Sequence, residues 1–201
     1  MIPSFDHTWR KARKKDRSLI QTTFECAEVS PGEKFAPPWE AEVQRFLRHR
    51  AITSANRMRN LGHGGRCLIG VDDQGVAAAL THYRMCDADF DEEDEEIKTF
   101  LRSGPPVREI AFLGVHLRHR HSGGAVANDA LDAALHDILD CEPEADLVFV
   151  VGRADYRNTG SERMLARNHF DKLKTGVPPP HENTRLSWWV RRLARPADTS
   201  N

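Results

Sequence analysis

The sequence has little cysteine, no long apolar run and no dominant charge. Its four cysteines, Cys26, Cys67, Cys86 and Cys141, lie far apart and form no CxxC pair, so neither a zinc knuckle nor a redox dithiol is indicated. No stretch is apolar enough to predict a membrane span or the core of a secretory signal. We therefore expect a cytoplasmic protein with reduced thiols and no membrane partner.

The charges are nearly balanced, with 29 Lys and Arg against 30 Asp and Glu, a net charge of -1. A chain this balanced has no global field to hold it on a polyanion, which argues against a nucleic-acid partner. Its 201 residues fit one globular domain. We expect a basic N-terminal arm over residues 1–17, a single domain over residues 18–194 and a flexible tail over residues 195–201.

Hydrophobic periodicity predicts alternating strands and helices. Apolar residues spaced by three and four, from Trp39 to Leu47, predict a helix that begins near Pro38. A hairpin is expected over residues 66–84, around the turn at residues 72–75. The other predicted strands cover residues 18–26, 107–117, 146–151 and 186–190, and the other predicted helices cover residues 98–101, 125–139 and 161–168.

The strongest local signal is the strand, loop and helix over residues 107–139. The loop includes Arg120, His121, Ser122, Gly123, Gly124 and Ala125. A helix N-terminus offers backbone N–H groups and partial positive charge, and glycines let an anion approach closely. Arg118 and Arg120 add cationic donors suited to phosphate. The pattern predicts a pyrophosphate site; it lacks the Gly-Lys-Ser/Thr ending of a Walker loop and the Gly-x-Gly-x-x-Gly of a Rossmann loop.

The spacing Arg120-x-x-Gly123-x-Ala125 is similar to the Q/R-x-x-G-x-G/A motif of the GNAT superfamily of N-acyltransferases. A second similarity follows the predicted strand at residues 146–151. There Asn158, Ser161 and Phe170 stand at the distances of the family's second motif, although His169 replaces its usual glycine. The resemblance covers roughly residues 39–190.

This resemblance implies an α+β, GNAT-like fold: a mixed, mostly antiparallel, twisted sheet of six or seven strands with helices on both faces. It implies that the strands at residues 107 and 146 run parallel and splay apart around the pantetheine arm of acetyl-CoA. Backbone groups near Val115 and Leu117, together with Asn158, would then contact that arm, and the residues of the 120–125 loop would hold the pyrophosphate. The implied activity is N-acetyltransferase, with acetyl-CoA as co-substrate and an amine as acceptor.

Glu109 is the candidate general base, because several family members use a glutamate on this strand. Its other interpretation is a strand-end carboxylate in water or paired with arginine. Many members carry a tyrosine as the thiolate acid where this chain has Leu165. A backbone N–H near Val115 is expected to donate a hydrogen bond to the developing oxyanion. The missing tyrosine keeps open a second interpretation, a catalytically degenerate protein that binds acyl-CoA without turnover.

Three further features leave alternatives open. His116, His119 and His121 are better interpreted as solvated or phosphate-facing loop residues than as zinc ligands, so no metal is expected. Eight of the ten residues from 87 to 96 are acidic. They either form a solvated surface insertion or attract a cationic amine acceptor electrostatically. The basic residues 10–17 are a solvated arm, or they contact RNA or the acidic run of another copy, so a homodimer is compatible with the pattern.

Overall fold

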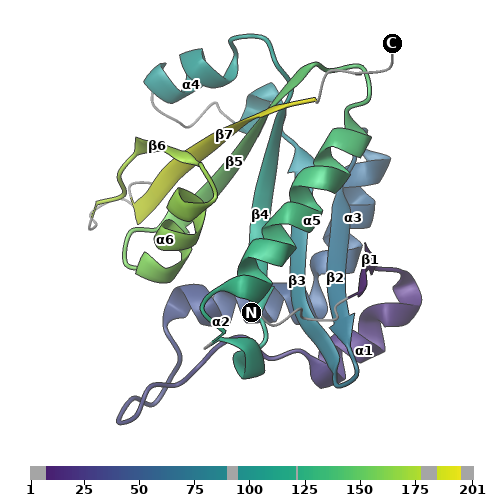
Figure 1. Cartoon of the computed structure of the whole chain (residues 1–201), viewed down its shortest axis with the longest axis vertical. Coiled ribbons are helices and arrows are strands. Elements are labelled where there is room, and N and C mark those ends of the chain that lie inside the picture. The colour runs from purple at the N-terminus through teal and green to yellow at the C-terminus, as the bar shows by residue number, and fades with distance from the viewer. Residues whose placement is uncertain (1–7, 90–94, 121, 178–184, 196–201) are drawn as a thin grey trace. The chain divides into compact units, whose positions relative to one another are not determined.

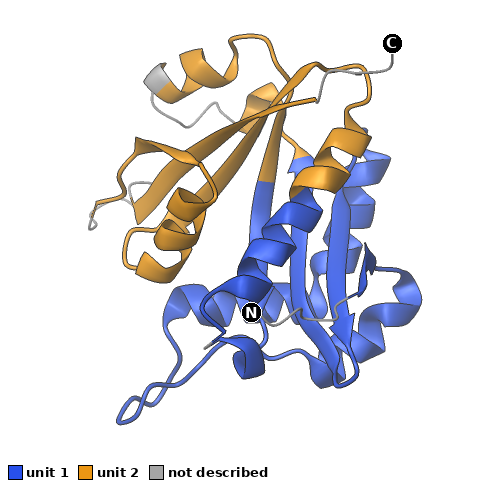
Figure 2. Ribbon diagram, viewed as in Figure 1, with its two compact units in different colours: residues 1–83, 110–134 blue, residues 84–109, 135–201 orange. Residues whose placement is uncertain are grey.

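The computed structural model describes residues 8–89, 95–120, 122–177 and 185–195. The chain divides into two compact units, each made from separate stretches of sequence (Figure 2). Unit 1 contains residues 1–83 and 110–134, and unit 2 contains residues 84–109 and 135–201. The prediction of a single domain over residues 18–194 stays a prediction.

Seven strands in the described residues form a mixed sheet in the order β1-β2-β3-β4-β5-β7-β6. The strand β4, Val107–Val115, begins in unit 2 and ends in unit 1. Helices cover both faces of the sheet: in unit 1, α5 lies on one side of the strands and α2 and α3 on the other (Figure 1). The predicted α+β class, the mixed sheet and the seven strands are thereby confirmed.

Unit 1 contains three consecutively paired strands: β1 (Thr8–Lys11), β2 (Arg66–Asp72) and β3 (Gly75–Arg84). The β2–β3 hairpin forms as predicted, with Asp72 paired to Gly75 across the turn. Strand β1 extends the sheet because Trp9 lies against Gly70, where a side chain would collide with the indole. Residues 8–11 of the predicted N-terminal arm are therefore part of the sheet.

The helices of unit 1 are α1 (Arg17–Thr23), α2 (Pro38–His49), α3 (Ala51–Asn60) and the first part of α5 (Ala125–Cys141). Helix α2 begins at Pro38 as expected. A buried cluster lies under α1, α2 and α3 and includes Ile20, Phe24, Leu47, Ile52 and Ile69. In α5 the buried positions recur at helical spacing, at Val126, Ala130, Leu131, Ala134, Leu135 and Ile138.

Unit 2 is built on β5 (Leu147–Asp155) and β7 (Leu186–Ala194), which pair antiparallel along their full nine residues. The short strand β6 (Asp171–Lys174) pairs with the outer edge of β7. Helices α4 (Glu95–Leu101) and α6 (Thr159–Arg167) complete the unit. Phe100 of α4 stacks on Phe149 of β5 with ring centroids 4.9 Å apart.

The strand expected over residues 18–26 is wrong, because residues 17–23 form the helix α1. The β-favouring residue types misled the prediction, since the hydrophobic spacing is helical: Ile20 and Phe24, four residues apart, are both buried. The hydroxyl groups of Thr22 and Thr23 donate to backbone carbonyls of the preceding turn, which suits threonine to a helix here. The sequence analysis also missed α3 and β6.

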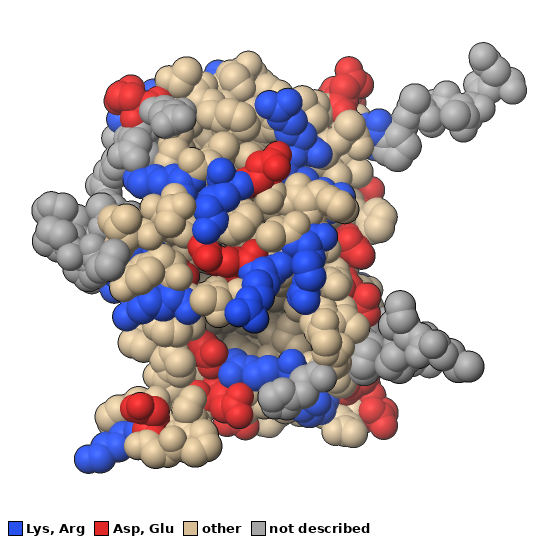
Figure 3. All heavy atoms as spheres, turned by 60° about the vertical axis from the view of Figure 1, so that its left-hand side comes forward, with Lys and Arg blue, Asp and Glu red and all other residues tan. Residues whose placement is uncertain are grey.

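The described residues include no helix long and apolar enough to cross a membrane. On the face that Figure 3 draws, Lys and Arg side chains lie among Asp and Glu side chains, as a net charge of -1 leads one to expect. The four cysteines are free thiols. Burial raises the pKa of the Cys26 and Cys67 thiols to about 12, so both are structural rather than reactive.

The close packing at Gly114 yields a first testable prediction. A Cβ at this position would lie 2.9 Å from Leu47 Cδ1, 3.0 Å from Cys26 Sγ and 3.1 Å from Phe24 Cζ. Gly114→Ala should therefore lower the free energy of unfolding by about 1–3 kcal/mol, measured by urea denaturation. The control is Gly160→Ala in α6, where the added Cβ meets no atom closer than 3.6 Å. Equal stability of the two variants would contradict this packing.

Candidate active site

The candidate anion site lies between β4 and α5, entirely within unit 1. Strand β4 ends at Val115, a short 3-10 turn covers Leu117–His119, and α5 begins at Ala125. Gly123 and Gly124 have positive φ angles of 66° and 85°, which favour glycine. A Cβ on Gly123 would meet no atom within 4 Å, so the space in front of it is open. His121 lies outside the described residues.

Backbone N–H groups are available at this loop. Ser122 and Ala125 use theirs in tight turns, donating to the carbonyls of His119 and Ser122. Within the part of the chain that the structure describes, no backbone acceptor faces the N–H of Gly123, Val126 or Ala127. The aligned peptides of the 17-residue helix α5 add partial positive charge at the same place. These residues therefore fit a bound phosphate group.

Arg120 is occupied by protein partners. Its guanidinium donates to Glu28 Oε2 at 2.9 Å, to Glu40 Oε2 at 2.8 Å and to the Cys26 carbonyl at 2.8 Å. The side chain therefore fastens the loop to the segment between α1 and α2 and to the start of α2. Arg120 was expected to face phosphate, but in this structure two carboxylates already balance its charge.

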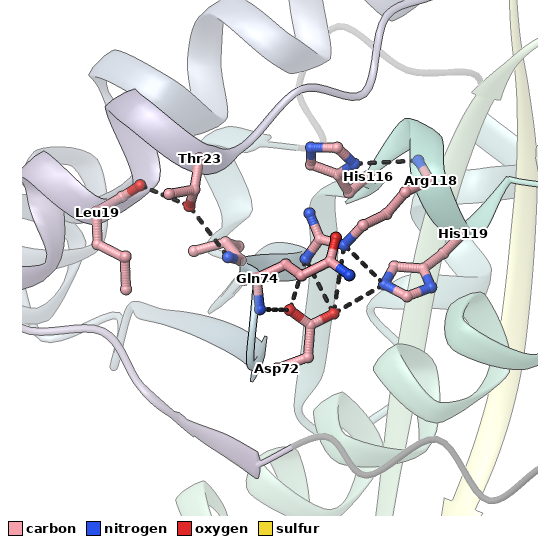
Figure 4. Close-up of polar contacts among 8 residues, drawn as sticks. Leu19, Thr23, Asp72, Gln74, His116, Arg118 and His119 are labelled. Atoms are coloured by element: carbon pink, nitrogen blue, oxygen red, sulfur yellow. Dashed lines mark hydrogen bonds and ion pairs between the residues drawn. The ribbon is translucent and has the colours of Figure 1, made fainter.

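Arg118 and His119 share the carboxylate of Asp72 at the end of β2 (Figure 4). Arg118 Nη2 donates to both Asp72 oxygens at 2.8 and 2.9 Å. His119 Nε2 lies 2.9 Å from Asp72 Oδ2 and 3.1 Å from Arg118 Nε. One ring nitrogen cannot both donate to the carboxylate and accept from the guanidinium. Because Arg118 already donates to Asp72, the tautomer with the proton on Nε2 satisfies the cluster best.

His116 is held by the same turn. Its Nδ1 accepts from the Arg118 N–H at 3.1 Å, and its ring meets the edge of Phe24. Burial, with added repulsion from Arg118 and His119, lowers the pKa of His116. It is therefore a neutral acceptor that shapes the turn. Among the described residues, no group of three or more His, Cys, Asp or Glu side chains is placed to hold a metal ion.

The end of β4 is tied into unit 1 by main-chain bonds. The His116 N–H donates to the Ala77 carbonyl, and the Leu117 N–H donates to the Glu25 carbonyl, both at 2.8 Å. The Leu117 carbonyl accepts from the Arg120 N–H at 3.1 Å. Both backbone groups of Leu117 thus have intramolecular partners. Leu117 was expected to pair with a pantetheine arm, but in this structure its backbone groups are used within the protein.

Glu109, the candidate base, lies in unit 2 and is 2% exposed. Its Oε1 accepts from Arg153 Nε on β5 at 2.6 Å. The Arg153 guanidinium also lies 5.1 Å from the centre of the Trp188 ring, so the pair is packed against a buried aromatic. The arginine-paired alternative for Glu109 is therefore present in the structure.

Asn158 begins α6, and its side-chain Oδ1 accepts from the Ser161 N–H at 3.0 Å, which caps the helix. The turn before it is fixed by Asp155, whose carboxylate binds Arg157 Nε at 2.9 Å and Arg185 Nη2 at 3.1 Å. These arginines hold the pKa of Asp155 at about 2. The two members of the second motif that the sequence singled out, Asn158 and Ser161, are thus brought together as a helix cap.

Leu165 is buried on the inner side of α6. Its Cδ2 would lie 3.1 Å from a Cβ on Gly152 of β5, so the leucine fills the space that the glycine leaves. The position where a tyrosine acid was expected is a hydrophobic packing position in this chain.

No protein-family model and no curated protein sequence matches the chain. Solved structures do match. A GNAT-family acetyltransferase from Desulfovibrio desulfuricans, so described, has a TM-score of 0.54 at 16% identity, over 94% of this chain and 98% of that one. Arabidopsis thaliana NAA60 in complex with a bisubstrate analogue has a TM-score of 0.55 at 14% identity, over 92% and 97%. The NatC complex bound to Gag peptide and CoA has a TM-score of 0.52 at 12% identity, over 96% and 100%.

This chain has the GNAT fold. The match extends over nearly the whole of each chain, so the fold inferred from two short motifs is confirmed. Within the GNAT fold the residues expected at the cofactor divide between the units. Val115 to Ala125 belong to unit 1, whereas Glu109 and Asn158 belong to unit 2.

Three carboxylates at this GNAT loop were not anticipated. Glu28 and Glu40 lie 92 and 80 residues from Arg120 along the chain, and Asp72 lies 46 residues from Arg118. No local pattern links residues so far apart. The only sequence signal was that a loop with two arginines and two histidines needs counter-charges from elsewhere in the chain.

Asp72 gives a pH prediction. Burial raises its pKa, but hydrogen bonds from Arg118, His119 and the Gln74 N–H outweigh this and lower it to about 2. Because the folded-state pKa lies below the unfolded value near 4, the stability it contributes is present above pH 4 and is lost as the pH falls towards 2. The loss should be about 2 kcal/mol.

The measurement is urea denaturation of the wild type and Asp72→Asn between pH 5 and pH 2. The wild type should lose more stability than the variant over this range, because asparagine does not titrate. If the free energy of unfolding fell equally with pH in both proteins, protonation of Asp72 would not affect the stability of the fold.

Proposed function

We propose that this chain is an N-acyltransferase that transfers an acetyl or other short acyl group from acyl-CoA to a primary amine. The observation that carries the proposal is the start of α5 on a GNAT fold. There Gly123 and Gly124 have positive φ angles, the surroundings of Gly123 are open, and the N–H groups of Gly123, Val126 and Ala127 have no backbone acceptor among the described residues. The GNAT-fold structures that match include one in complex with CoA and one with a bisubstrate analogue, which supports a CoA thioester as the acyl donor.

The pyrophosphate is held mainly by the main chain in this proposal. Arg118 and Arg120 are engaged by Asp72, Glu28 and Glu40, so they shape the loop and set its local field. The N–H groups of Gly123, Val126 and Ala127 then supply the direct contacts, with Ser122 and Gly124 lining the approach. Asn158 caps α6 through its Oδ1, which leaves its amide nitrogen to meet the cofactor arm.

Acyl transfer needs a neutral amine, an acceptor for its proton and stabilisation of the developing oxyanion. The bound thioester supplies the activated acyl group. We assign proton acceptance to Glu109, with Arg153 fixing the carboxylate in one orientation. A backbone N–H at Val115 supplies the oxyanion contact. With Leu165 buried against Gly152, no tyrosine hydroxyl serves the thiolate at that position, so the thiolate leaves unaided or takes its proton from water.

The same leucine favours a second candidate, a GNAT-fold protein that binds acyl-CoA without turnover. The two functions share the anion site and differ only in the chemistry beyond it. The acceptor amine stays open in both; a cationic amine drawn to the acidic residues 87–96 is one proposal, and residues 90–94 lie outside the described part of the chain.

Gly123→Glu tests the anion site. A glutamate at a φ of 66° strains the loop and places a carboxylate against the expected phosphates, so the affinity for acetyl-CoA should fall at least tenfold, on the order of 1.4 kcal/mol or more. The measurement is a calorimetric titration with acetyl-CoA. Gly62→Glu is the matched control, because Gly62 has a φ of 85° and equally open surroundings. Unchanged affinity in Gly123→Glu would mean that the loop is misassigned.

Glu109→Gln tests the base. With acetyl-CoA and a panel of amines, release of free CoA thiol should fall by about 100-fold or more, while acetyl-CoA binding is retained. The control is Glu142→Gln. Glu142 is also a buried glutamate of unit 2 that pairs with an arginine, accepting from Arg108 Nη1 at 2.8 Å, but it has no proposed role in catalysis.

Both substitutions disturb a buried ion pair, so both should lower the melting temperature, but only Glu109→Gln should stop turnover below it. Equal activity of the two variants would reduce Glu109 to a structural role. Tight acetyl-CoA binding by the wild type, without thiol release for any amine, would favour the second candidate.

A further inference from the structure

The net charge of the chain is close to zero, but basic and acidic residues are unevenly distributed along the sequence. Residues 10–17 and 45–59 together hold eleven Lys and Arg and one acidic residue, Asp16, whereas the rest of the chain holds eighteen Lys and Arg and 29 Asp and Glu. No Asp or Glu occurs anywhere in residues 43–71. The balance that argued against a polyanionic partner therefore does not describe this part of the chain.

The fold brings the two basic stretches together within unit 1. Arg17, at the start of α1, donates from Nη2 to Thr53 Oγ1 on α3 at 2.9 Å. Gln21 Nε2, one turn further along α1, lies 3.5 Å from His49 Nδ1 at the end of α2. The beginning of α1, the end of α2 and one side of α3 thus meet at one surface.

The cations at this junction lie on its exposed side. Thr53 and Arg57 lie four residues apart on the side of α3 that Arg17 contacts, and Arg50, the residue immediately before the helix, stands three residues before Thr53. Lys14 stands three residues before Arg17. Lys14, Arg17, Arg50 and Arg57 are all exposed, and we call these four residues the basic surface.

The basic surface has no internal counter-charge. Asp16, the one acidic residue within the two basic stretches, is buried, and its carboxylate accepts two bonds from Arg10, at 2.7 and 2.9 Å, and one from the Arg13 N–H. Within the described ranges, none of the four cations forms an ion pair with a carboxylate. Four unneutralised cations on one surface repel one another, and a ligand that presents several anionic groups together relieves that repulsion.

A phosphodiester backbone fits this spacing. Arg50 and Arg57 are separated by roughly 10 Å along the axis of α3, within reach of neighbouring phosphates on one nucleic-acid strand. Lys and Arg side chains neutralise phosphates whatever the base sequence, so the proposed contacts are to the backbone rather than to base edges. Leu61 is the exposed large hydrophobic residue next to α3. A single exposed leucine offers too little apolar surface to bind a lipid bilayer. We propose that the basic surface binds the phosphate backbone of a double-stranded nucleic acid.

The test uses the full chain with labelled RNA and DNA duplexes of the same sequence, about 20 base pairs long, titrated by fluorescence anisotropy at several salt concentrations. Arg50→Ala/Arg57→Ala should weaken duplex binding by about tenfold at low salt, and the slope of log Kd against log salt should fall by about two. The control is Arg163→Ala/Arg167→Ala, which removes two equally exposed arginines from α6 and should change neither. Arg57→Ala alone should lower the slope by about one.

Each outcome decides the proposal. Salt-dependent binding of either duplex that the α3 variant weakens and the α6 variant preserves supports it, and the two duplexes show which backbone is preferred. Equal losses in both variants would indicate general charge attraction and overturn it. So would binding to phosphatidylserine vesicles without binding to a duplex, or self-association in sedimentation that Arg50→Ala/Arg57→Ala abolishes without any duplex binding. Acetyl-CoA titrations should be unaffected throughout, because the inference does not depend on the acyltransferase site.

Discussion

The loop between β4 and α5 depends on the pairing of its arginines with carboxylates from distant parts of unit 1. Arg120 joins the loop to Glu28, Glu40 and the Cys26 carbonyl, and Arg118 joins it to Asp72. Charge-assisted bonds of this kind contribute about 1.5–3 kcal/mol when partly shielded from water, as at Asp72, whereas the more exposed Arg120–Glu28 pair contributes about 0–1 kcal/mol. Together they fasten the loop in which the surroundings of Gly123 are open. Because both guanidinium groups are engaged by carboxylates, the proposed anion site depends on the main chain.

The pairing of some cations with carboxylates, and not of others, also explains why a nearly neutral chain can present local electrostatic fields of both signs. The loop cations are balanced close by, whereas Lys14, Arg17, Arg50 and Arg57 form no ion pair with a carboxylate in the part of the chain that the structure describes, and the carboxylate of Asp16 is committed to Arg10. Coulomb interactions between exposed charges fade over about 10 Å at moderate salt. A net charge summed over a chain of this size therefore says little about any single surface.

The sequence predicted what depends on neighbouring residues. The strand, glycine loop and helix around Gly123, the hairpin at Asp72 and Gly75, and the helix after Asn158 are all local patterns, and the structure contains each of them. The prediction failed for α1, because residue type was given more weight than the four-residue spacing of Ile20 and Phe24. It missed the partners of Arg120, and for Glu109 it offered an arginine partner without identifying Arg153. An ion pair across tens of residues is set by the fold and leaves no local pattern.

Leu165 is a buried packing residue at the position where the family resemblance led us to expect a tyrosine. With Gly152 opposite it, a leucine side chain closes the space between α6 and β5 by packing alone. A tyrosine there would bring a hydroxyl group that needs a hydrogen-bond partner when buried. Replacing it with leucine removes that requirement, and burial of the leucine stabilises the contact by about 1.5–3 kcal/mol. The helix therefore stays in place without a phenol, so the packing of α6 on β5 does not depend on the tyrosine that the family resemblance led us to expect.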